Sequence, residues 1–204
     1  MNKNLMWIIG GVVGLALVVG LAWAIAGEEP LDESAGFGNP TVTGENLPVA
    51  GSGGGDPAVG MTAPTVVGAD WKGNAVSIEP DGRPKIVVFL AHWCPHCQRE
   101  VPVIQQWVED GNLPEGVDIY GVTIFTNSAR TNFPPQDWLE RENWTIPTLM
   151  DNSDSSVARG FGVASTPTYA VLDGDNKNLG RASGEIGVAG LNTLAAIAAA
   201  AVEG

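Results

Sequence analysis

Residues 61–204 are predicted to fold as an α/β domain, with a central mixed β-sheet flanked by helices. Three observations predict this class: apolar, β-branched runs alternate with helical patterns, the last two strands are arranged as a hairpin, and an alanine-rich helix follows them. A chain that alternates in this way covers both faces of its sheet with helices. A stretch of this length also builds its own core without a metal ion or a structural disulfide.

The first strand and the helix after it are the most clearly marked elements. The run KIVVFLA at 85–91 is apolar and β-branched, which is typical of a strand buried on both faces. Pro95 suits the first turn of a helix, and Pro102 is expected to kink that helix. Gly111 and Pro114 are expected to end it. One apolar stripe at helical spacing supports the assignment: Cys97, Val101, Ile104 and Val108.

The remaining elements complete the sheet and its cover. In chain order we expect a strand at 117–125, a loop at 126–144 with a short helix starting near Pro135, a strand at 147–151, a short helix at 154–163, hairpin strands at 168–173 and 178–184, and a helix at 188–202. The turn sequence Gly174-Asp175-Asn176 indicates the hairpin.

The first residues have a different character. Residues 5–26 are uncharged and almost wholly apolar, and at this length a helix reaches roughly 33 Å, enough to cross a bilayer. Lys3 precedes the run and acidic residues follow it, so the positive-inside rule places residues 1–4 in the cytoplasm and the domain outside. We therefore expect an N-terminal transmembrane helix that anchors the chain in the cell membrane by a single pass. A cleaved signal peptide is the alternative, because Ala24-Ile25-Ala26 resembles a cleavage site; both alternatives export the domain.

Residues 27–60 are predicted to be a flexible linker, because nine glycines and four prolines leave few large apolar side chains to bury. The domain would then lie on the periplasmic or outer face of the membrane. The chain has a formal charge of −13, and residues 61–204 carry 17 acidic and 9 basic side chains, a net charge of −8. Nucleic-acid binding requires clustered lysine and arginine, so that class of function is excluded.

Both cysteines of the chain lie in the stretch AHWCPHCQREVP, at 91–102. Cys94 is expected at the start of a helix, where unpaired N–H groups and the helix macrodipole favour the thiolate. A protonated His96 would add positive charge beside it, and both effects lower the pKa of a thiol. Cys97 lies one turn further on, where it could attack a mixed disulfide formed at Cys94. The pair is therefore predicted to be a redox centre with one attacking and one resolving thiol.

Two other roles compete with the redox centre. A structural disulfide gains little from so short a loop, because the stabilisation grows with loop length. A metal clamp would use Cys94, Cys97, His92 and His96, although a structural zinc site usually has a second ligand pair, and none follows downstream. An exported copper-binding module with these residues stays open as an alternative of a different class. We expect no bound metal and no cofactor.

With these residues in place, the domain resembles the thioredoxin superfamily. The resemblance rests on FLAHWCPHC at 89–97, on the helix with Pro102, and on Thr166-Pro167 before a hairpin strand, and it covers residues 61 to about 202. It implies a thioredoxin-like fold and a cis Thr166-Pro167 peptide bond packed beside the cysteines. Pro147 also precedes an apolar strand, but no hairpin follows it, so the cis bond is expected at Pro167 and not at Pro147.

Glu100 narrows the resemblance to one branch. The spacing C-x-x-C-x-x-E-x-P, the expected anchor and the insertion at 127–145 are similar to the TlpA/ResA-like membrane-anchored reductases, in which the glutamate works with the cysteines. Thioredoxin proper has a buried Asp where this chain has Val88. Glu100 is thus a candidate general base for Cys97, with a solvated helix residue as the alternative.

The resemblance also implies roles around the cysteines. The backbone of Thr166 is expected to pair with an extended substrate segment, as in strand addition. Trp93 is expected to shield the thiolate and shape the substrate groove, whereas His92 is expected to face water. Pro167 and His96 complete the set of catalytic candidates.

The expected activity is thiol–disulfide exchange with exported proteins, and the direction of electron flow stays open. The branch resemblance favours a reductase, acting for example on apocytochrome c or other exported thiols, with a membrane or exported protein as its redox partner. The Pro-His dipeptide between the cysteines is similar to that of DsbA-type oxidants, in which a stabilised thiolate makes the disulfide oxidising. A disulfide-forming oxidase is therefore the alternative.

Overall fold

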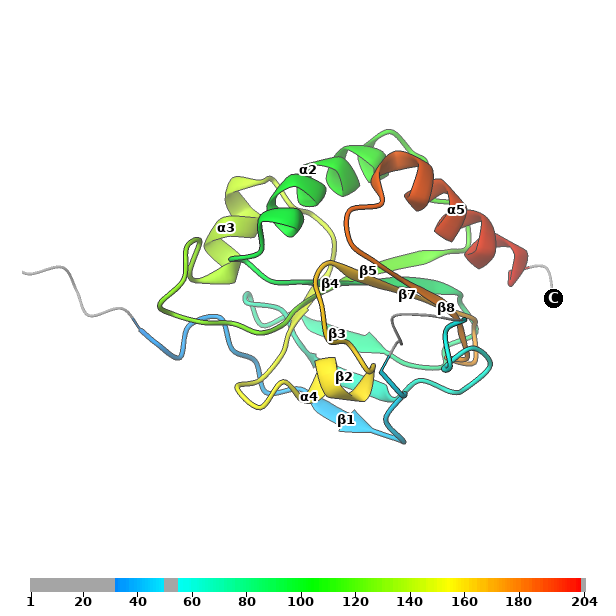
Figure 1. Ribbon diagram of the computed structural model, residues 1–204, viewed down its shortest axis with the longest axis horizontal. Helices are drawn as coiled ribbons and strands as arrows, with labels where there is room; N and C mark the ends of the chain where they lie inside the picture. Colours follow the sequence, from blue (N-terminus) through cyan, green and yellow to red (C-terminus); the bar gives the residue numbers. More distant parts are fainter. Residues whose placement is uncertain (1–31, 50–54, 203–204) are drawn as a thin grey trace, which may run out of the picture. The chain divides into compact units, whose positions relative to one another are not determined.

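A five-stranded mixed β-sheet lies at the centre of the domain (Figure 1). The structure, a computed structural model, describes residues 32–49 and 55–202, and Glu33–Gly204 form one compact unit. In sheet order the strands are β6 (Thr148–Met150), β5 (Asp118–Thr123), β4 (Lys85–Leu90), β7 (Thr168–Leu172) and β8 (Asn178–Ser183). The middle strand, β4, is buried along its whole length and pairs in parallel with β5 and antiparallel with β7. The predicted mixed sheet and its buried first strand are confirmed.

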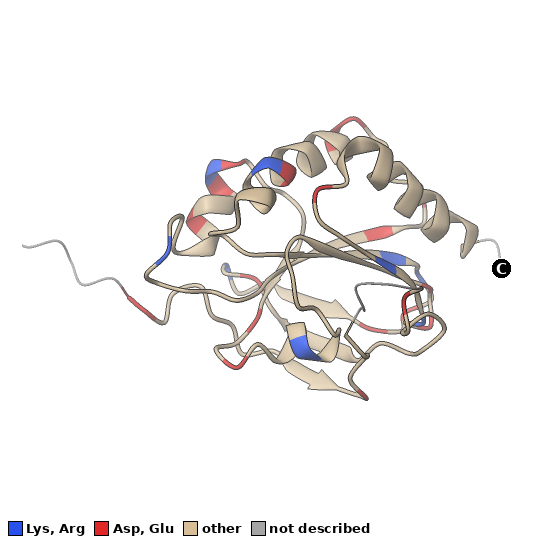
Figure 2. Cartoon of the chain, viewed as in Figure 1, with Lys and Arg blue, Asp and Glu red and all other residues tan. Residues whose placement is uncertain are grey.

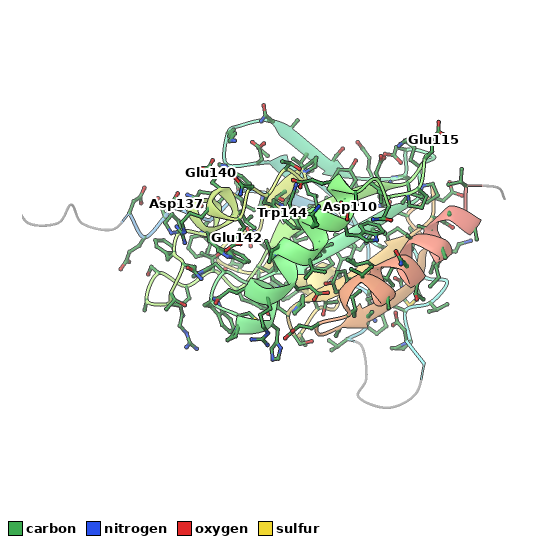
Figure 3. The ribbon with its side chains drawn as sticks, turned by 90° about the horizontal axis from the view of Figure 1, so that it is seen from above. Asp110, Glu115, Asp137, Glu140, Glu142 and Trp144 are labelled. Carbon is green, nitrogen blue, oxygen red and sulfur yellow. The ribbon has the colours of Figure 1, made fainter. Side chains whose placement is uncertain are left out.

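Helices cover one face of this sheet. They are α2 (Pro95–Glu109), α3 (Pro135–Arg141) and α5 (Gly187–Ala200). Figure 1 shows them together on this face, and Figure 3, which looks down on the helices, shows α2 beside α5. Apolar side chains between these helices and the sheet form a core that includes Ile104, Trp107 and Leu191. Pro102 lies inside α2, which continues to Glu109.

A second, smaller sheet covers the opposite face. It consists of β1 (Thr41–Thr43), β2 (Thr65–Ala69) and β3 (Ala75–Ile78), all antiparallel, with the short helix α4 (Ser156–Gly160) beside it (Figure 1). The expectation that helices cover both faces is therefore met only in part, because this face is covered by three strands and one short helix. These strands have three to five residues each, too few for a clear alternating pattern in the sequence.

The predicted linker at 27–60 is wrong for the residues that the structure describes. β1 pairs with β2, and the side chains of Leu47 and Ala58 are buried in the core of the domain. Arg181 on β8 holds the later part of this segment, because its guanidinium pairs with Asp56 and donates to the carbonyl oxygen of Pro48 at 2.8 Å. Residues 27–60 contain few large apolar side chains, and these specific contacts hold the described part of the segment on the domain.

The predicted cytoplasmic N-terminus at 1–4 and the predicted anchor at 5–26 lie outside the described residues. Within 32–49 and 55–202, no helix is both long enough and apolar enough to cross a membrane.

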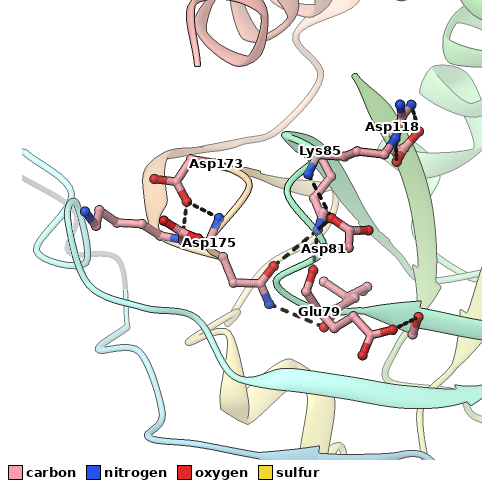
Figure 4. Close-up of polar contacts among 11 residues, drawn as sticks. Glu79, Asp81, Lys85, Asp118, Asp173 and Asp175 are labelled. Atoms are coloured by element: carbon pink, nitrogen blue, oxygen red, sulfur yellow. Dashed lines mark hydrogen bonds and ion pairs between the residues drawn. The ribbon is translucent and has the colours of Figure 1, made fainter. Parts of the chain in front are cut away.

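A buried lysine ties the loops together at the end of the sheet where β4 begins (Figure 4). The ammonium group of Lys85 is fully buried and donates to Asp81 Oδ1 at 2.7 Å, to the carbonyl oxygen of Glu79, and to Asn176 Oδ1 at 3.4 Å. Beside it, Arg83 forms an ion pair of 2.6 Å with Asp118. A buried charge requires such partners to offset its lost hydration. This network lies at the start of β4, whereas Cys94 follows the opposite end of the same strand.

Candidate active site

Cys94 lies where the central strand passes into α2. β4 ends at Leu90, and Cys94 is the N-cap residue of α2, with Pro95 in the first turn. Its own N–H donates to the carbonyl oxygen of Ala91 at 3.0 Å, which closes the turn between strand and helix. The sulfur therefore stands at the positive end of a helix of 15 residues, as the sequence predicted.

The two sulfurs differ in exposure, and both residues are free thiols. Cys97 is fully buried, and its Sγ accepts a hydrogen bond from the N–H of Ala91 at 3.5 Å. Cys94 is also buried, with 5% of its surface exposed, but it is the more accessible of the pair. Its Sγ donates to the carbonyl oxygen of Thr166 at 3.3 Å.

The surroundings separate the acidities of the two thiols. Burial raises the pKa of Cys94, but the side chain of Thr166 and the backbone N–H groups of Cys97 and His96, which favour the thiolate, outweigh it, so the pKa of Cys94 is lowered overall. Burial raises the pKa of Cys97 to about 12, and the nearby charge of Cys94 adds to this effect. At neutral pH the attacking thiol is therefore the one that ionises more readily, and the resolving thiol stays protonated.

Thr166 and Pro167 immediately precede β7, and the carbonyl oxygen of Thr166 contacts the sulfur of Cys94. The Thr166-Pro167 peptide bond is cis, as predicted, and Ile146-Pro147 is not among the cis bonds of the described residues. Pro167 is buried, and its carbonyl oxygen accepts the N–H of Gly184 at 2.8 Å. The structure thus brings together Cys94, Thr166 and Pro167, which are far apart in the sequence.

Glu100 is buried rather than solvated. Its side chain is 2% exposed, and Oε1 accepts three hydrogen bonds: from the hydroxyl of Tyr169 at 3.0 Å, from the N–H of Ile186 at 3.0 Å, and from the N–H of Gly187 at 2.8 Å. The carboxylate therefore joins α2 to β7 and to the first turn of α5. Burial and the nearby Glu100 charge raise the pKa of Tyr169, which keeps its hydroxyl a donor. No local sequence pattern indicates that Tyr169 is a partner of Glu100.

His96 is exposed, and its imidazole contacts a carboxylate that the sequence did not point to. Nδ1 of His96 lies 2.5 Å from Oε1 of Glu185, and Nε of Arg99 lies 3.1 Å from both carboxylate oxygens. Arg99, and then His96, lower the pKa of Glu185 to about 2. Glu185 therefore stays charged and offsets positive charge next to Cys94. Arg99 follows His96 by three residues on α2, a spacing that places the two side chains on the same face of the helix.

Trp93 is fixed beside the nucleophile by two contacts. Its indole N–H donates to the carbonyl oxygen of Phe125 at 2.8 Å. The guanidinium of Arg130 lies over its ring, 5.1 Å from the ring centroid. Both partners come from the segment between β5 and α3, which includes the first part of the predicted insertion at 127–145. The ring is half-buried, consistent with a wall beside Cys94.

His92 is buried, so the expectation that it faces water is wrong. Its Nδ1 lies 2.7 Å from the carbonyl oxygen of Thr131, and its Nε2 lies 3.2 Å from the N–H of Asn127. A carbonyl requires a donor and an N–H requires an acceptor, so the ring is neutral with its proton on Nδ1. Burial lowers the pKa of His92, although the bond to Thr131 opposes the shift. Its role is to fasten the loop 127–132 to the start of α2.

The four residues of the alternative metal clamp are not arranged as one cluster. Among the described residues, no group of three or more His, Cys, Asp or Glu side chains could hold a metal ion. His92 could bind a metal only after giving up a hydrogen bond at one of its two ring nitrogens.

Known proteins with similar sequences are redox enzymes by name. The sporulation thiol-disulfide oxidoreductase A of Bacillus subtilis is 26% identical over 102 residues, which are 50% of this chain and 60% of that protein. The thiol-disulfide oxidoreductase ResA of Bacillus cereus is 23% identical over 128 residues, 62% of this chain and 70% of that protein. These names agree with the class of enzyme that the sequence predicts.

Solved structures agree in fold. StoA from Bacillus subtilis matches with a TM-score of 0.56 and 22% identity, covering 68% of this chain and 98% of that one. A thiol:disulfide interchange protein of the thioredoxin family from Chlorobium tepidum matches with a TM-score of 0.55 and 23% identity, covering 69% and 95%. The Redoxin family itself matches residues 58–186, which include both cysteines, Glu100 and Pro167. With more than half of its length matched, this chain belongs to the Redoxin family and has the predicted thioredoxin-like fold.

Proposed function

We propose that this protein is a membrane-tethered, extracytoplasmic thiol–disulfide oxidoreductase that exchanges disulfides with exported proteins through Cys94 and Cys97. One observation carries the proposal. The two thiols lie one helical turn apart, the first with a lowered pKa and the second buried with a pKa of about 12. This difference suits one sulfur to attack and the other to resolve.

In the reducing direction, the Cys94 thiolate attacks one sulfur of a substrate disulfide, and the other substrate sulfur leaves as a thiolate. Cys97 then loses its proton, attacks Sγ of Cys94 and releases the second substrate sulfur. The substrate gains two electrons, and the two cysteines become a disulfide. A membrane or exported redox partner reduces this disulfide again, so no cofactor is required.

Glu100 is the proposed acceptor of the Cys97 proton. It follows Cys97 by one turn of α2 and is buried with it. All hydrogen bonds of its carboxylate that involve described residues end on Oε1, so Oε2 is left to take a proton. Such a base is needed, because a thiol with a pKa of about 12 does not ionise by itself at neutral pH.

Substrate binding is proposed at the rim formed by Trp93 and Thr166. The carbonyl oxygen of Thr166 accepts a hydrogen bond from the Cys94 thiol in the reduced protein. Once Cys94 is a thiolate, that bond has no donor, and the carbonyl becomes available to an N–H of an extended substrate segment. Pro167 positions this carbonyl beside the sulfur.

The tether and the compartment rest on the sequence. The apolar run at 5–26, with Lys3 before it and acidic residues after it, supports a single-pass anchor with the domain outside. The full chain is expected in the membrane fraction, with its domain open to protease added from outside. Recovery of the full chain in the cytoplasmic fraction would refute this part of the proposal.

We favour a reductase, because the expected anchor, the insertion and Glu100 all match one branch of the family. One observation favours the oxidase instead: hydrogen bonds that lower the pKa of Cys94 also stabilise the reduced protein. The reduction potential of the couple decides between them. A value near the thioredoxin potential of about −270 mV supports the reductase, and one near the DsbA potential of about −120 mV supports the oxidase.

Activity is tested with the full chain in detergent. The protein should catalyse reduction of insulin disulfides by dithiothreitol, whereas the Cys94→Ser variant should not. Titration of the reduced chain with Cu(I) provides the counter-test, since tight copper binding without disulfide exchange would favour the copper-binding alternative.

A further inference from the structure

We infer that Arg130 is a specificity-determining residue, which selects partner segments that carry a carboxylate next to their reactive cysteine. The inference deepens the proposed function and rests on it. It concerns the rim of the site formed by Trp93 and the loop 127–132, not the sulfur chemistry.

Arg130 lies over the side chain that precedes the nucleophile. Its guanidinium is 5.1 Å from the centroid of the Trp93 ring, and Trp93 is adjacent to Cys94 in the sequence. The indole cannot turn away freely, because its N–H is bonded to the carbonyl oxygen of Phe125 at 2.8 Å. A partner whose sulfur reaches Cys94 therefore brings its neighbouring residues close to this cation.

The loop that carries Arg130 is fastened on both sides of it. His92 binds the N–H of Asn127 before Arg130 and the carbonyl oxygen of Thr131 after it. A turn within the loop adds a hydrogen bond of 3.1 Å from the N–H of Arg130 to the carbonyl oxygen of Asn127. The amide of Asn132 also donates to the backbone of His92 at 3.3 Å. A cation held in this way loses less conformational freedom when it binds an anion.

The charge of Arg130 has no acidic partner in the described part of the domain. The side chain of Arg130 is exposed, and it forms no ion pair with any residue in 32–49 or 55–202. By contrast, Arg99 on α2 forms an ion pair with Glu185. Figure 2 shows basic positions on α2, on α3 and on the loop before α3 at one end of the domain. Of these, Arg141 on α3 donates to Asn132 at 3.1 Å.

An acidic partner segment is the occupant that this charge favours. The chain has a formal net charge of −13, so long-range electrostatics repel acidic proteins. Beside the nucleophile, a single unpaired guanidinium reverses this repulsion and attracts acidic groups, because arginine binds carboxylates through two parallel hydrogen bonds. A glutamate or aspartate next to the partner's cysteine would pair with Arg130 while the disulfide meets Cys94.

The test uses three matched peptide disulfides that have Glu, Gln or Lys beside the cysteine, with the full chain in detergent at low ionic strength. The parent protein should react with the Glu peptide about 2- to 5-fold faster than with the Gln peptide, in kcat/KM, as expected for one exposed ion pair. The Lys peptide should be slowest. Added salt should remove the preference.

Two variants make the test specific. Arg130→Gln should lose the Glu-over-Gln preference, and Arg130→Glu should prefer the Lys peptide. The control Arg159→Gln removes the same charge from an exposed position on α4 and should keep the preference of the parent. Equal rates for the Glu and Gln peptides in the parent, or an undiminished preference in Arg130→Gln, would overturn the inference alone. No exchange with any peptide would overturn the proposed function as well.

Discussion

The sulfur of Cys94 lies 3.3 Å from the carbonyl oxygen of Thr166, so the nucleophile and the proposed substrate-binding backbone share one hydrogen bond in the reduced protein. Ionisation of Cys94 removes the donor and frees the carbonyl in a single event. The ionisation that makes Cys94 nucleophilic therefore also makes the Thr166 carbonyl available to an extended substrate segment. The consequences of this arrangement can be tested one residue at a time.

Separate substitution of the two cysteines should have different effects. Cys94→Ala removes the attacking sulfur, so disulfide exchange should stop and no covalent complex should form. Cys97→Ala keeps the attacker but removes the resolving thiol, so mixed disulfides with a peptide substrate should accumulate. Non-reducing electrophoresis with mass spectrometry measures both results. Equal residual activity in the two variants would contradict the division of roles.

Glu100→Gln should slow resolution near neutral pH. Glutamine keeps an oxygen that can accept from Tyr169, Ile186 and Gly187, but it cannot take a proton as a carboxylate does. Rapid-quench measurement of the release of the second substrate thiol reads this step directly. Glu100→Ala is the structural comparison, and it should lower the free energy of unfolding by about 1–3 kcal/mol, because buried donors lose their acceptor. Unchanged release kinetics in Glu100→Gln would leave Glu100 with a structural role only.

His92 should make the stability of the domain depend on pH. Burial lowers its pKa in the folded state, so the unfolded chain binds a proton first as the pH falls. The free energy of unfolding should therefore be highest above about pH 6.5, the ordinary pKa of histidine, and should fall below it by up to about 1.4 kcal/mol per pH unit. Urea denaturation between pH 5 and 8, an interval of about three units around that pKa, measures the slope.

His92→Gln should flatten this slope, because glutamine can donate to Thr131 and accept from Asn127 without titrating. The matched control is His96→Gln, which replaces an exposed imidazole and should keep the slope associated with His92. If His92→Gln and the parent show the same dependence on pH, the fastening of the loop does not rely on a neutral imidazole.

Glu185→Gln should lower the pKa of Cys94 further. The Glu185 carboxylate has a pKa of about 2 and stays charged, and it offsets the positive charge of Arg99 near the nucleophile. Its removal leaves that positive charge to favour the thiolate. The ultraviolet absorbance of the thiolate as a function of pH measures the shift. Glu140→Gln on α3 is the charge-matched control, and a midpoint in Glu185→Gln that equals the control or rises above it would refute the coupling.

Local signals made much of the fold and the sulfur pair predictable. β4 is a continuous apolar run, α2 combines a proline in its first turn with an apolar stripe, and Pro167 precedes a hairpin. Each of these features depends only on residues that are close together in the sequence. The central sheet, the position of Cys94 at the start of α2 and the cis bond followed from them.

Contacts between distant segments were not predictable in the same way. β1 becomes a strand only because β2, more than twenty residues later, pairs with it. His92 is buried by the loop 127–132, and Glu185 reaches Arg99 across 86 positions of the sequence. The local sequence around β1, His92 and Glu185 does not indicate which distant segment each of them contacts. The surroundings of the cysteines therefore required the folded structure, whereas the cysteines themselves did not.

The central claim is that Cys94 ionises far more readily than Cys97. The most direct measurement is the rate of alkylation of each cysteine by iodoacetamide as a function of pH in the reduced full chain, resolved by mass spectrometry. We predict that Cys94 is modified first, with a midpoint below the value of about 8.5 for a free cysteine, while Cys97 stays unmodified until strongly alkaline pH. Equal midpoints for the two thiols, or earlier modification of Cys97, would contradict the account.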